Sequence, residues 1–253
     1  MANQALPEKK REMLRFHGAD LGYDGHIALH NVNLVVSPGD YIALVGSSGS
    51  GKTLLLRSLL GIVAPLGGRV VVASGVRVGY VPELESVADA FPLTALEIAT
   101  MGCYRNLGVL RRPGEADRDL AQDTLNDLGI GHLCHQAYRD LSEMQRHRVL
   151  IARALTGSPH LLIVDESAKG LDLTAEKALL GLLDRIRTQR KMTILVATHS
   201  LNVVANHCKS IGILHDHQLH LGPTGEVLQG EYLRKVYGVS LRVFETEGLK
   251  VVI

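Results

Sequence analysis

The chain has 253 residues, of which 27 are Lys or Arg, 26 are Asp or Glu, and 46% are hydrophobic. A chain of this size can bury one large core or two small ones. The formal net charge of +1 argues against a protein that holds nucleic acid by neutralising phosphates, so we expect no nucleic-acid partner. The three cysteines are far apart and odd in number, which suggests neither a disulfide framework nor a paired zinc site.

Apolar runs such as residues 54–60 and 161–164 are much shorter than the roughly 20 residues that cross a bilayer. Near the N-terminus, residues 9–11 are basic, and Glu12 follows where a secretory signal would need an apolar stretch. We therefore expect a cytoplasmic chain that does not itself span a membrane.

The first third of the chain predicts strands around one helix. Apolar residues alternate on both sides of the Asp24-Gly25 turn pair, which predicts short strands over residues 13–37. Residues 41–45 predict a buried strand, and a glycine-rich turn then leads into a helix that begins near Thr53. Further strands, broken by glycines, are predicted over residues 67–81.

The middle of the chain predicts mainly helices, and the part after it predicts both strands and helices. Residues 93–101 and 115–128 predict helices, the second capped by Gly129. Helices at 143–155 and 174–190 then alternate with strands at 161–164 and 193–198, which predicts a parallel sheet and an α/β fold. The last residues alternate in hydropathy and predict a hairpin that turns at Glu247-Gly248.

The most specific motif fits the pattern G-x-x-x-x-G-K-[ST] between an apolar strand and a helix. Its glycines allow consecutive backbone N–H groups to face phosphate oxygens, and the helix N-terminus adds positive potential. Lys52 is expected to bridge the β- and γ-phosphates, and the Thr53 hydroxyl to bind Mg²⁺. The bare pattern arises by chance in roughly one chain in a hundred of this length. The candidate phosphate-binding residues are Gly46, Ser47, Ser48, Gly49, Ser50, Gly51, Lys52 and Thr53.

Two acidic residues follow the apolar strand 161–164, at the edge where open parallel sheets bind ligands. Asp165 is expected to hold the Mg²⁺ shell, and Glu166 to act as the general base that takes a proton from the attacking water. An acidic pair at a strand end is more often a helix cap, but its position beside a phosphate loop favours the catalytic interpretation.

In this order, the motifs resemble the ATP-binding subunit of ABC transporters over nearly the whole chain. By that resemblance Tyr23 stacks on adenine, and Leu141-Ser142-Glu143-Met144-Gln145 takes the place of the signature Leu-Ser-Gly-Gly-Gln, in which Ser142 contacts ATP across a dimer. Gly170-Leu171-Asp172 resembles the loop at the dimer seam, and His199 resembles the switch histidine that contacts the γ-phosphate.

The resemblance implies a P-loop NTPase fold with a parallel-sheet core, an N-terminal antiparallel β subdomain and an α-helical subdomain. A single ATP-binding domain would span residues 1–253, with the core and β subdomain at 12–83 and 159–230, the helical subdomain at 84–158 and an extension at 231–253. ATP and Mg²⁺ are the implied cofactors. The implied partners are a membrane-embedded permease, a second ATP-binding subunit and, for an importer, a substrate-binding protein, which would place the chain peripherally on the cytoplasmic face of the membrane.

Two positions depart from the family pattern. Glu83 replaces a glutamine that contacts Mg²⁺ and water, and Glu143-Met144 replaces two glycines that let backbone approach phosphate. A carboxylate about 5 Å from a phosphate charge costs about 3 kcal/mol at a dielectric of about 20, and less than about 1 in water. Either Glu143 points into solvent, or the part of an ATP site that this turn would contribute is weak. The chain could then pair with a different ATPase subunit that has the regular signature, or form a homodimer that tolerates the altered turn. Ser142 and Gln145 also form a capping-box pattern, which is a purely structural alternative.

The transported species is open between two branches. Residues 91–94, 101–102 and 107–120 resemble the zinc, manganese and iron branch, whereas Tyr237-Gly238-Val239 and the following strand residues resemble the iron-chelate, haem and cobalamin branch. A histidine-rich stretch invites a metal-sensor interpretation, but a solvated turn is favoured; it contains His215, Asp216, His217 and His220. Alternatives of another class are a weakly hydrolysing regulatory subunit and a non-transport ABC protein.

Overall fold

The computed structural model of this chain describes residues 12–83, 92–107, 111–165, 173–238, 243–246 and 249–252. Within these ranges six strands form the central sheet, in the order β5-β6-β7-β3-β8-β9. The ladders from β5 to β8 are parallel, and β9 pairs with β8 in the antiparallel sense. The strands are β3 (Tyr41–Val45), β5 (Val78–Val81), β6 (Leu161–Asp165), β7 (Thr193–Thr198), β8 (Ser210–His215) and β9 (Gln218–Pro223). The predicted parallel-sheet core is confirmed.

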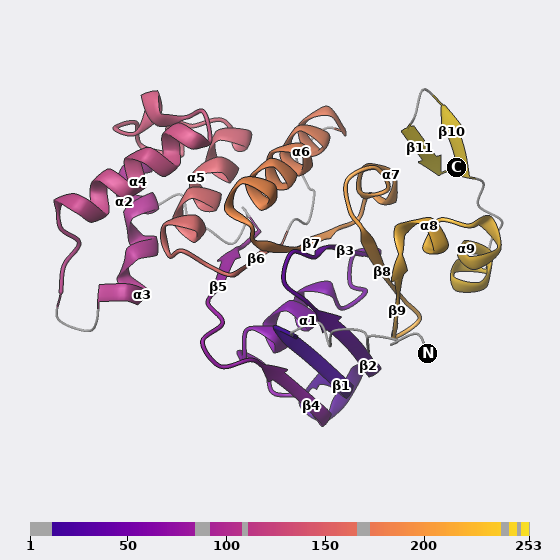
Figure 1. The fold of residues 1–253 in the computed structure, drawn as a ribbon. Helices are drawn as coiled ribbons and strands as arrows, with labels where there is room; N and C mark the ends of the chain where they lie inside the picture. Colours follow the sequence, from indigo (N-terminus) through magenta and orange to yellow (C-terminus); the bar gives the residue numbers. More distant parts are fainter. Residues whose placement is uncertain are drawn as a thin grey trace, which may run out of the picture.

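A second, antiparallel sheet lies below the central sheet in the view of Figure 1, in the order β2-β1-β4. It consists of β1 (Leu14–Tyr23), β2 (His26–Val36) and β4 (Gly67–Val72). Asp24 and Gly25 join β1 to β2 with φ angles of 50° and 79°, the left-handed conformation that a tight hairpin needs. The predicted turn is therefore where the sequence placed it, although β4 belongs to this sheet and β5 to the central one.

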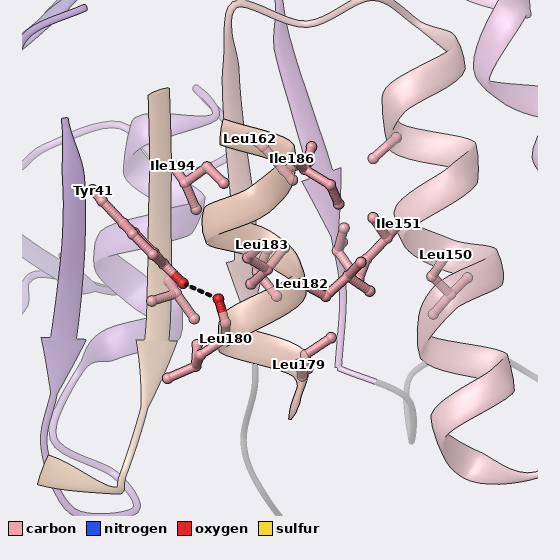
Figure 2. Close-up of a cluster of buried hydrophobic side chains, with 14 of the residues drawn as sticks. Tyr41, Leu150, Ile151, Leu162, Leu179, Leu180, Leu182, Leu183, Ile186 and Ile194 are labelled. Atoms are coloured by element: carbon pink, nitrogen blue, oxygen red, sulfur yellow. Dashed lines mark hydrogen bonds between the residues drawn. The ribbon is translucent and has the colours of Figure 1, made fainter. Parts of the chain in front are cut away.

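Both faces of the central sheet are covered, which explains why β3, β6 and β7 are buried throughout. Helix α1 (Lys52–Leu59) and the antiparallel sheet cover one face. Helices α5 (Glu143–Thr156) and α6 (Leu173–Arg190) cover the other. Figure 2 shows the leucines of α6 against this second face, where the Tyr41 hydroxyl donates a hydrogen bond to the Leu180 carbonyl at 3.2 Å.

The helical part of the chain lies beside β5, at one edge of the central sheet (Figure 1). It contains α2 (Ala95–Thr100), α3 (Tyr104–Leu107), α4 (Glu115–Asp127) and α5, with 3₁₀ turns at Met101–Cys103, Gly131–Leu133 and Tyr138–Asp140. Gly129, with φ of 73°, follows α4 in the left-handed conformation expected of a C-terminal cap. The predicted helices at 93–101, 115–128 and 143–155 are therefore present, with ends that shift by one or two residues.

At the opposite edge of the sheet, α8 (Thr224–Val227) and α9 (Gly230–Tyr237) pack near β8 and β9, and α7 (Leu201–Val204) contacts α6 and β11 (Leu249–Val252). Strands β10 (Val243–Thr246) and β11 pair as the predicted hairpin, and the turn expected at 247–248 lies outside the described residues. Cys103, Cys134 and Cys208 are buried and unbridged. Of the helices in the described ranges, none has the length and apolar character that crossing a membrane requires.

Candidate functional site

The parallel sheet gathers the candidate residues at one edge. Val45 of β3 pairs with Thr198 of β7, and Asp165 of β6 pairs with Ala197 of the same strand. All three strands run in the same direction, so their carboxyl ends lie at the same end of the sheet. That end carries the phosphate-loop motif after β3, the Asp165 carboxylate and His199 after β7. Residues that are more than 150 positions apart in the chain are thereby brought to one site.

The turn between β3 and α1 requires glycine for two different reasons. Gly49 and Gly51 have φ angles of 80° and 96°, which side chains rarely adopt. Gly46 is needed for space, because a Cβ atom there would lie 2.3 Å from Ser50 Oγ and 2.8 Å from the Leu214 carbonyl oxygen. The pattern of glycines in the motif is therefore explained by backbone conformation at two positions and by close packing at the third.

Lys52 is the first residue of α1 and is only 8% exposed. Its Nζ donates hydrogen bonds to the carbonyl oxygens of Gly46 and Ser47, at 2.7 and 2.8 Å. Burial lowers the pKa of Lys52, while the negative charges of Asp165 and Glu83 oppose that change. The ammonium group is therefore held beneath the turn, with acidic groups close enough to favour its charged form.

Asp165 ends β6 and is 3% exposed. Burial raises the pKa of Asp165, against hydrogen bonds from the Tyr80 and Thr53 hydroxyls and the charges of Lys52 and Arg57. The Tyr80 hydroxyl donates to Asp165 Oδ2 at 3.2 Å. Burial, followed by the charge of Asp165, raises the pKa of Tyr80 to about 12, so Tyr80 remains a hydrogen-bond donor at neutral pH.

A cavity of about 490 Å³ opens between these groups. Its lining combines the phosphate loop with Tyr23, Arg57, Glu83 and Asp165. Tyr23, at the end of β1, is 47% exposed. Arg57 adds a cation that sequence reasoning did not single out, although its position one helical turn after Thr53 could have indicated it.

The residues around this cavity fit a nucleoside triphosphate with Mg²⁺. Ser50 Oγ is buried and has no hydrogen-bond partner among the residues that the structure describes, which leaves a hydroxyl donor within the phosphate loop. Lys52 and the N-terminus of α1 supply positive charge for phosphates. The carboxylates of Asp165 and Glu83 and the Thr53 hydroxyl are hard oxygen ligands, the kind that Mg²⁺ prefers.

His199 is exposed and follows β7 directly. The turn that carries it is anchored by the buried Thr198, whose hydroxyl donates to Glu176 Oε1 of α6 at 2.6 Å. Thr198 Oγ1 also accepts a hydrogen bond from the Ser200 amide at 3.2 Å. Glu176 is a buried acidic residue that sequence reasoning missed, because the helical pattern of α6 gives no indication of a polar partner.

Ser142 lies elsewhere, exposed at the N-terminus of α5. Its amide donates to Gln145 Oε1 at 2.8 Å and its hydroxyl accepts from the Gln145 amide at 3.4 Å, which forms the predicted capping box. Glu143 is half-buried, and Met144 packs against the hydrophobic core. Glu166 and the segment with Asp172 lie outside the described residues.

The histidine-rich stretch runs from the last residue of β8 through a tight turn at Asp216 and His217 into β9. Asp216 and His217 have φ angles of 46° and 60°, and His217 Nδ1 hydrogen-bonds the Ala28 carbonyl at 2.9 Å. In the described parts of the chain, no three His, Cys, Asp or Glu side chains converge as metal ligands would. The turn interpretation agrees with this geometry, although the turn also packs on β2.

Comparison with known proteins decides the family. A model of the ABC transporter family matches residues 29–169, which is more than half of the chain. The chain belongs to the ABC transporter family. This ABC ATPase is 32% identical to the manganese transport system ATP-binding protein MntB of Bacillus subtilis, over 87% of the chain and 90% of that protein. It is also 32% identical to the zinc import ATP-binding protein ZnuC of Roseobacter denitrificans, over 88% of the chain and 83% of that protein.

A solved metal-chelate type ABC transporter, in an inward-facing conformation, shares the fold of this ABC ATPase. The two chains superpose with a TM-score of 0.86 at 26% sequence identity, and the match covers 96% of each. The family resemblance and the P-loop NTPase fold expected from the motifs are therefore confirmed. The chain is an ATPase that powers an ABC transporter.

Proposed function

We propose that this ABC ATPase drives import of a transition metal ion, with manganese or zinc as the first candidates. The main support for ATP-driven activity is the cavity lined by the phosphate loop, Asp165 and Glu83. The main support for a metal substrate is that relatives of the chain are named for manganese transport and zinc import. The second candidate is a metal chelate, such as an iron chelate, haem or cobalamin. It is favoured by the metal-chelate type transporter, which matches nearly the full length of the chain.

Within the site we propose the following division of roles. Lys52 and the backbone amides of residues 46–53 bind the phosphates, and Tyr23 stacks on the adenine. Thr53, Asp165 and Glu83 hold Mg²⁺, which when bound supplies positive charge at the phosphate oxygens. Glu166 accepts the proton of the attacking water and His199 contacts the γ-phosphate. The exposed Tyr23 and the buried Asp165, which both line the cavity, support these roles.

Ser142 and Asp172 are proposed to act at a dimer seam, where two ATP-binding subunits meet. The further partners proposed are a membrane-embedded permease and an extracytoplasmic substrate-binding protein, which would place the ATPase peripherally on the cytoplasmic face of the membrane. The exposed position of Ser142 at the end of α5 supports contact with another subunit. Isolation of the intact complex and determination of its subunits test this arrangement, and two identical ATPase copies would exclude the heterodimer.

The catalytic proposal is tested with the ATPase purified in complex with its permease. Lys52→Ala should lose nucleotide binding or turnover, whereas Glu166→Gln should retain Mg-ATP binding and lose hydrolysis. Lys177→Ala is the matched control, because Lys177 is exposed on α6. A parent complex with no affinity for Mg-ATP would refute the proposal, and parental turnover in Glu166→Gln would refute the base assignment.

The substrate is tested by transport into vesicles that contain the complete complex. Stimulation of ATP hydrolysis and uptake by free Mn²⁺ or Zn²⁺ supports the first candidate. Stimulation by a chelated metal, without a response to the free ions, supports the second. The comparison should use the same complex with Lys52→Ala, so that passive uptake is subtracted.

A further inference from the structure

Tyr80 and Asp165 are brought together by the register of two neighbouring strands. Tyr80 of β5 pairs with Ile163 of β6, and Asp165 is two residues beyond Ile163. Because strand side chains alternate between faces, Ile163 and Asp165 share a face with Tyr80. Neighbouring strands lie about 4.8 Å apart, so a tyrosine side chain on β5 can reach a residue on β6, and the hydroxyl of Tyr80 lies 3.2 Å from Asp165 Oδ2.

Contacts at both ends of Tyr80 fix the position of its hydroxyl. The main chain belongs to the β5–β6 ladder, and its carbonyl oxygen accepts a hydrogen bond from Arg153 Nη2 of α5 at 3.5 Å. The side chain packs against the hydrophobic cluster on the α1 face of the sheet. The ring therefore has little freedom to turn its hydroxyl away from Asp165.

We propose that Tyr80 is a positioning residue that orients the Asp165 carboxylate for Mg²⁺. This inference rests on the proposed function of Asp165. The tyrosine hydroxyl donates to Oδ2 and thereby limits rotation of the Asp165 carboxyl group. Because Asp165 is only 3% exposed, water could not readily replace this hydroxyl if it were removed. Without the hydroxyl, Asp165 would turn toward the Thr53 hydroxyl and the positive charge of Lys52. Removal of a side chain that orients a metal ligand in this way commonly lowers metal affinity by about 10- to 100-fold.

The test is Tyr80→Phe, which retains the ring and removes only the hydroxyl. ATP affinity is measured in the full chain by calorimetry, first with excess EDTA and then across a Mg²⁺ titration. The Mg²⁺ concentration that gives half of the Mg²⁺-dependent gain in ATP affinity should rise by about 10-fold. The ATP affinity measured without metal should stay at the parent value. Tyr41→Phe is the matched control, because the buried Tyr41 hydroxyl donates to the Leu180 carbonyl, away from the site.

The measured pattern separates the outcomes. An equal loss of ATP affinity with and without Mg²⁺ would assign Tyr80 to packing alone and overturn the inference, as would an unchanged Mg²⁺ requirement. A similar shift in Tyr41→Phe would also overturn it, because the effect would then not depend on Asp165. If the parent chain and its complex bind no Mg-ATP, the proposed function itself fails, and the inference falls with it.

Discussion

Thr198→Val is expected to loosen the turn that carries His199. In the native chain the Thr198 hydroxyl donates to Glu176 Oε1 at 2.6 Å and accepts from the Ser200 amide at 3.2 Å. Valine has nearly the same shape but replaces the hydroxyl with a methyl group. Both hydrogen bonds are lost, and the Glu176 carboxyl, which belongs to a residue 3% exposed, loses the partner that Thr198 provides.

The size of the effect follows from these two bonds. A buried polar group left without its partner costs about 1–3 kcal/mol, and the lost bond to the half-buried Ser200 amide adds about 0.5–1.5 kcal/mol. The free energy of unfolding should therefore fall by about 1.5–4.5 kcal/mol in Thr198→Val. Thr198→Ser retains the hydroxyl and loses only a buried methyl group, which costs about 1 kcal/mol.

Urea unfolding of the two variants and the parent measures this difference. If His199 contacts the γ-phosphate as proposed, steady-state ATP hydrolysis by the complex should fall in the valine variant and remain close to the parent in the serine variant. Equal stability of the valine and serine variants would refute the reasoning, because it would show that the hydrogen bonds to Glu176 and Ser200 do not hold the turn.

Three further perturbations test separate features. Gly46→Ala should weaken nucleotide binding, measured by calorimetry, because its Cβ would lie 2.8 Å from the Leu214 backbone carbonyl oxygen as well as 2.3 Å from Ser50 Oγ; binding at the parent affinity would contradict the role of close packing. Gly181→Ala in α6 should stabilise the chain by about 0.5–1 kcal/mol in urea unfolding, since its Cβ would meet nothing within 4 Å, and a loss of stability would contradict this. Burial lowers the pKa of His147 from its ordinary value of 6.5 to about 4. Between these values the unfolded state binds more protons, so the parent should lose about 2 kcal/mol of stability from about pH 6.5 to 5. His147→Leu should lose less over that range, and an identical pH dependence in both chains would remove His147 as the cause.

The sequence predicted those parts of the fold and site that depend on local pattern. The run of residues 41–53 contains its own strand, turn and helix start, and the structure has them as β3, the phosphate loop and α1. The capping box of Ser142 and Gln145 was equally local and was found. The α/β class followed from alternation of strands and helices.

Contacts between distant strands were beyond such reasoning. Tyr80 was visible just before the noted Glu83, but its bond to Asp165 depends on how β5 pairs with β6. Nothing in the sequence indicates which residues pair when two parallel strands are joined through a long helical segment. Glu176 is similar, since its partner Thr198 lies 22 residues away, on a strand beneath its helix. Both residues are polar groups whose partners become adjacent only after the sheet has formed.

The altered signature turn shows how one short segment can serve two separate requirements. Ser142 and Gln145 bond to each other and begin α5, so helix capping alone is sufficient to explain their presence. The two residues between them contribute differently, because Met144 packs against the core while Glu143 remains half-buried. Replacement of both by glycine would therefore remove core packing as well as a negative charge, and a change in turnover would combine the two effects. Glu143→Gln keeps the size and removes the charge, so it tests whether this charge repels the nucleotide that the proposed second subunit would bind. Raised turnover in that variant alone would indicate that the charge weakens this half-site.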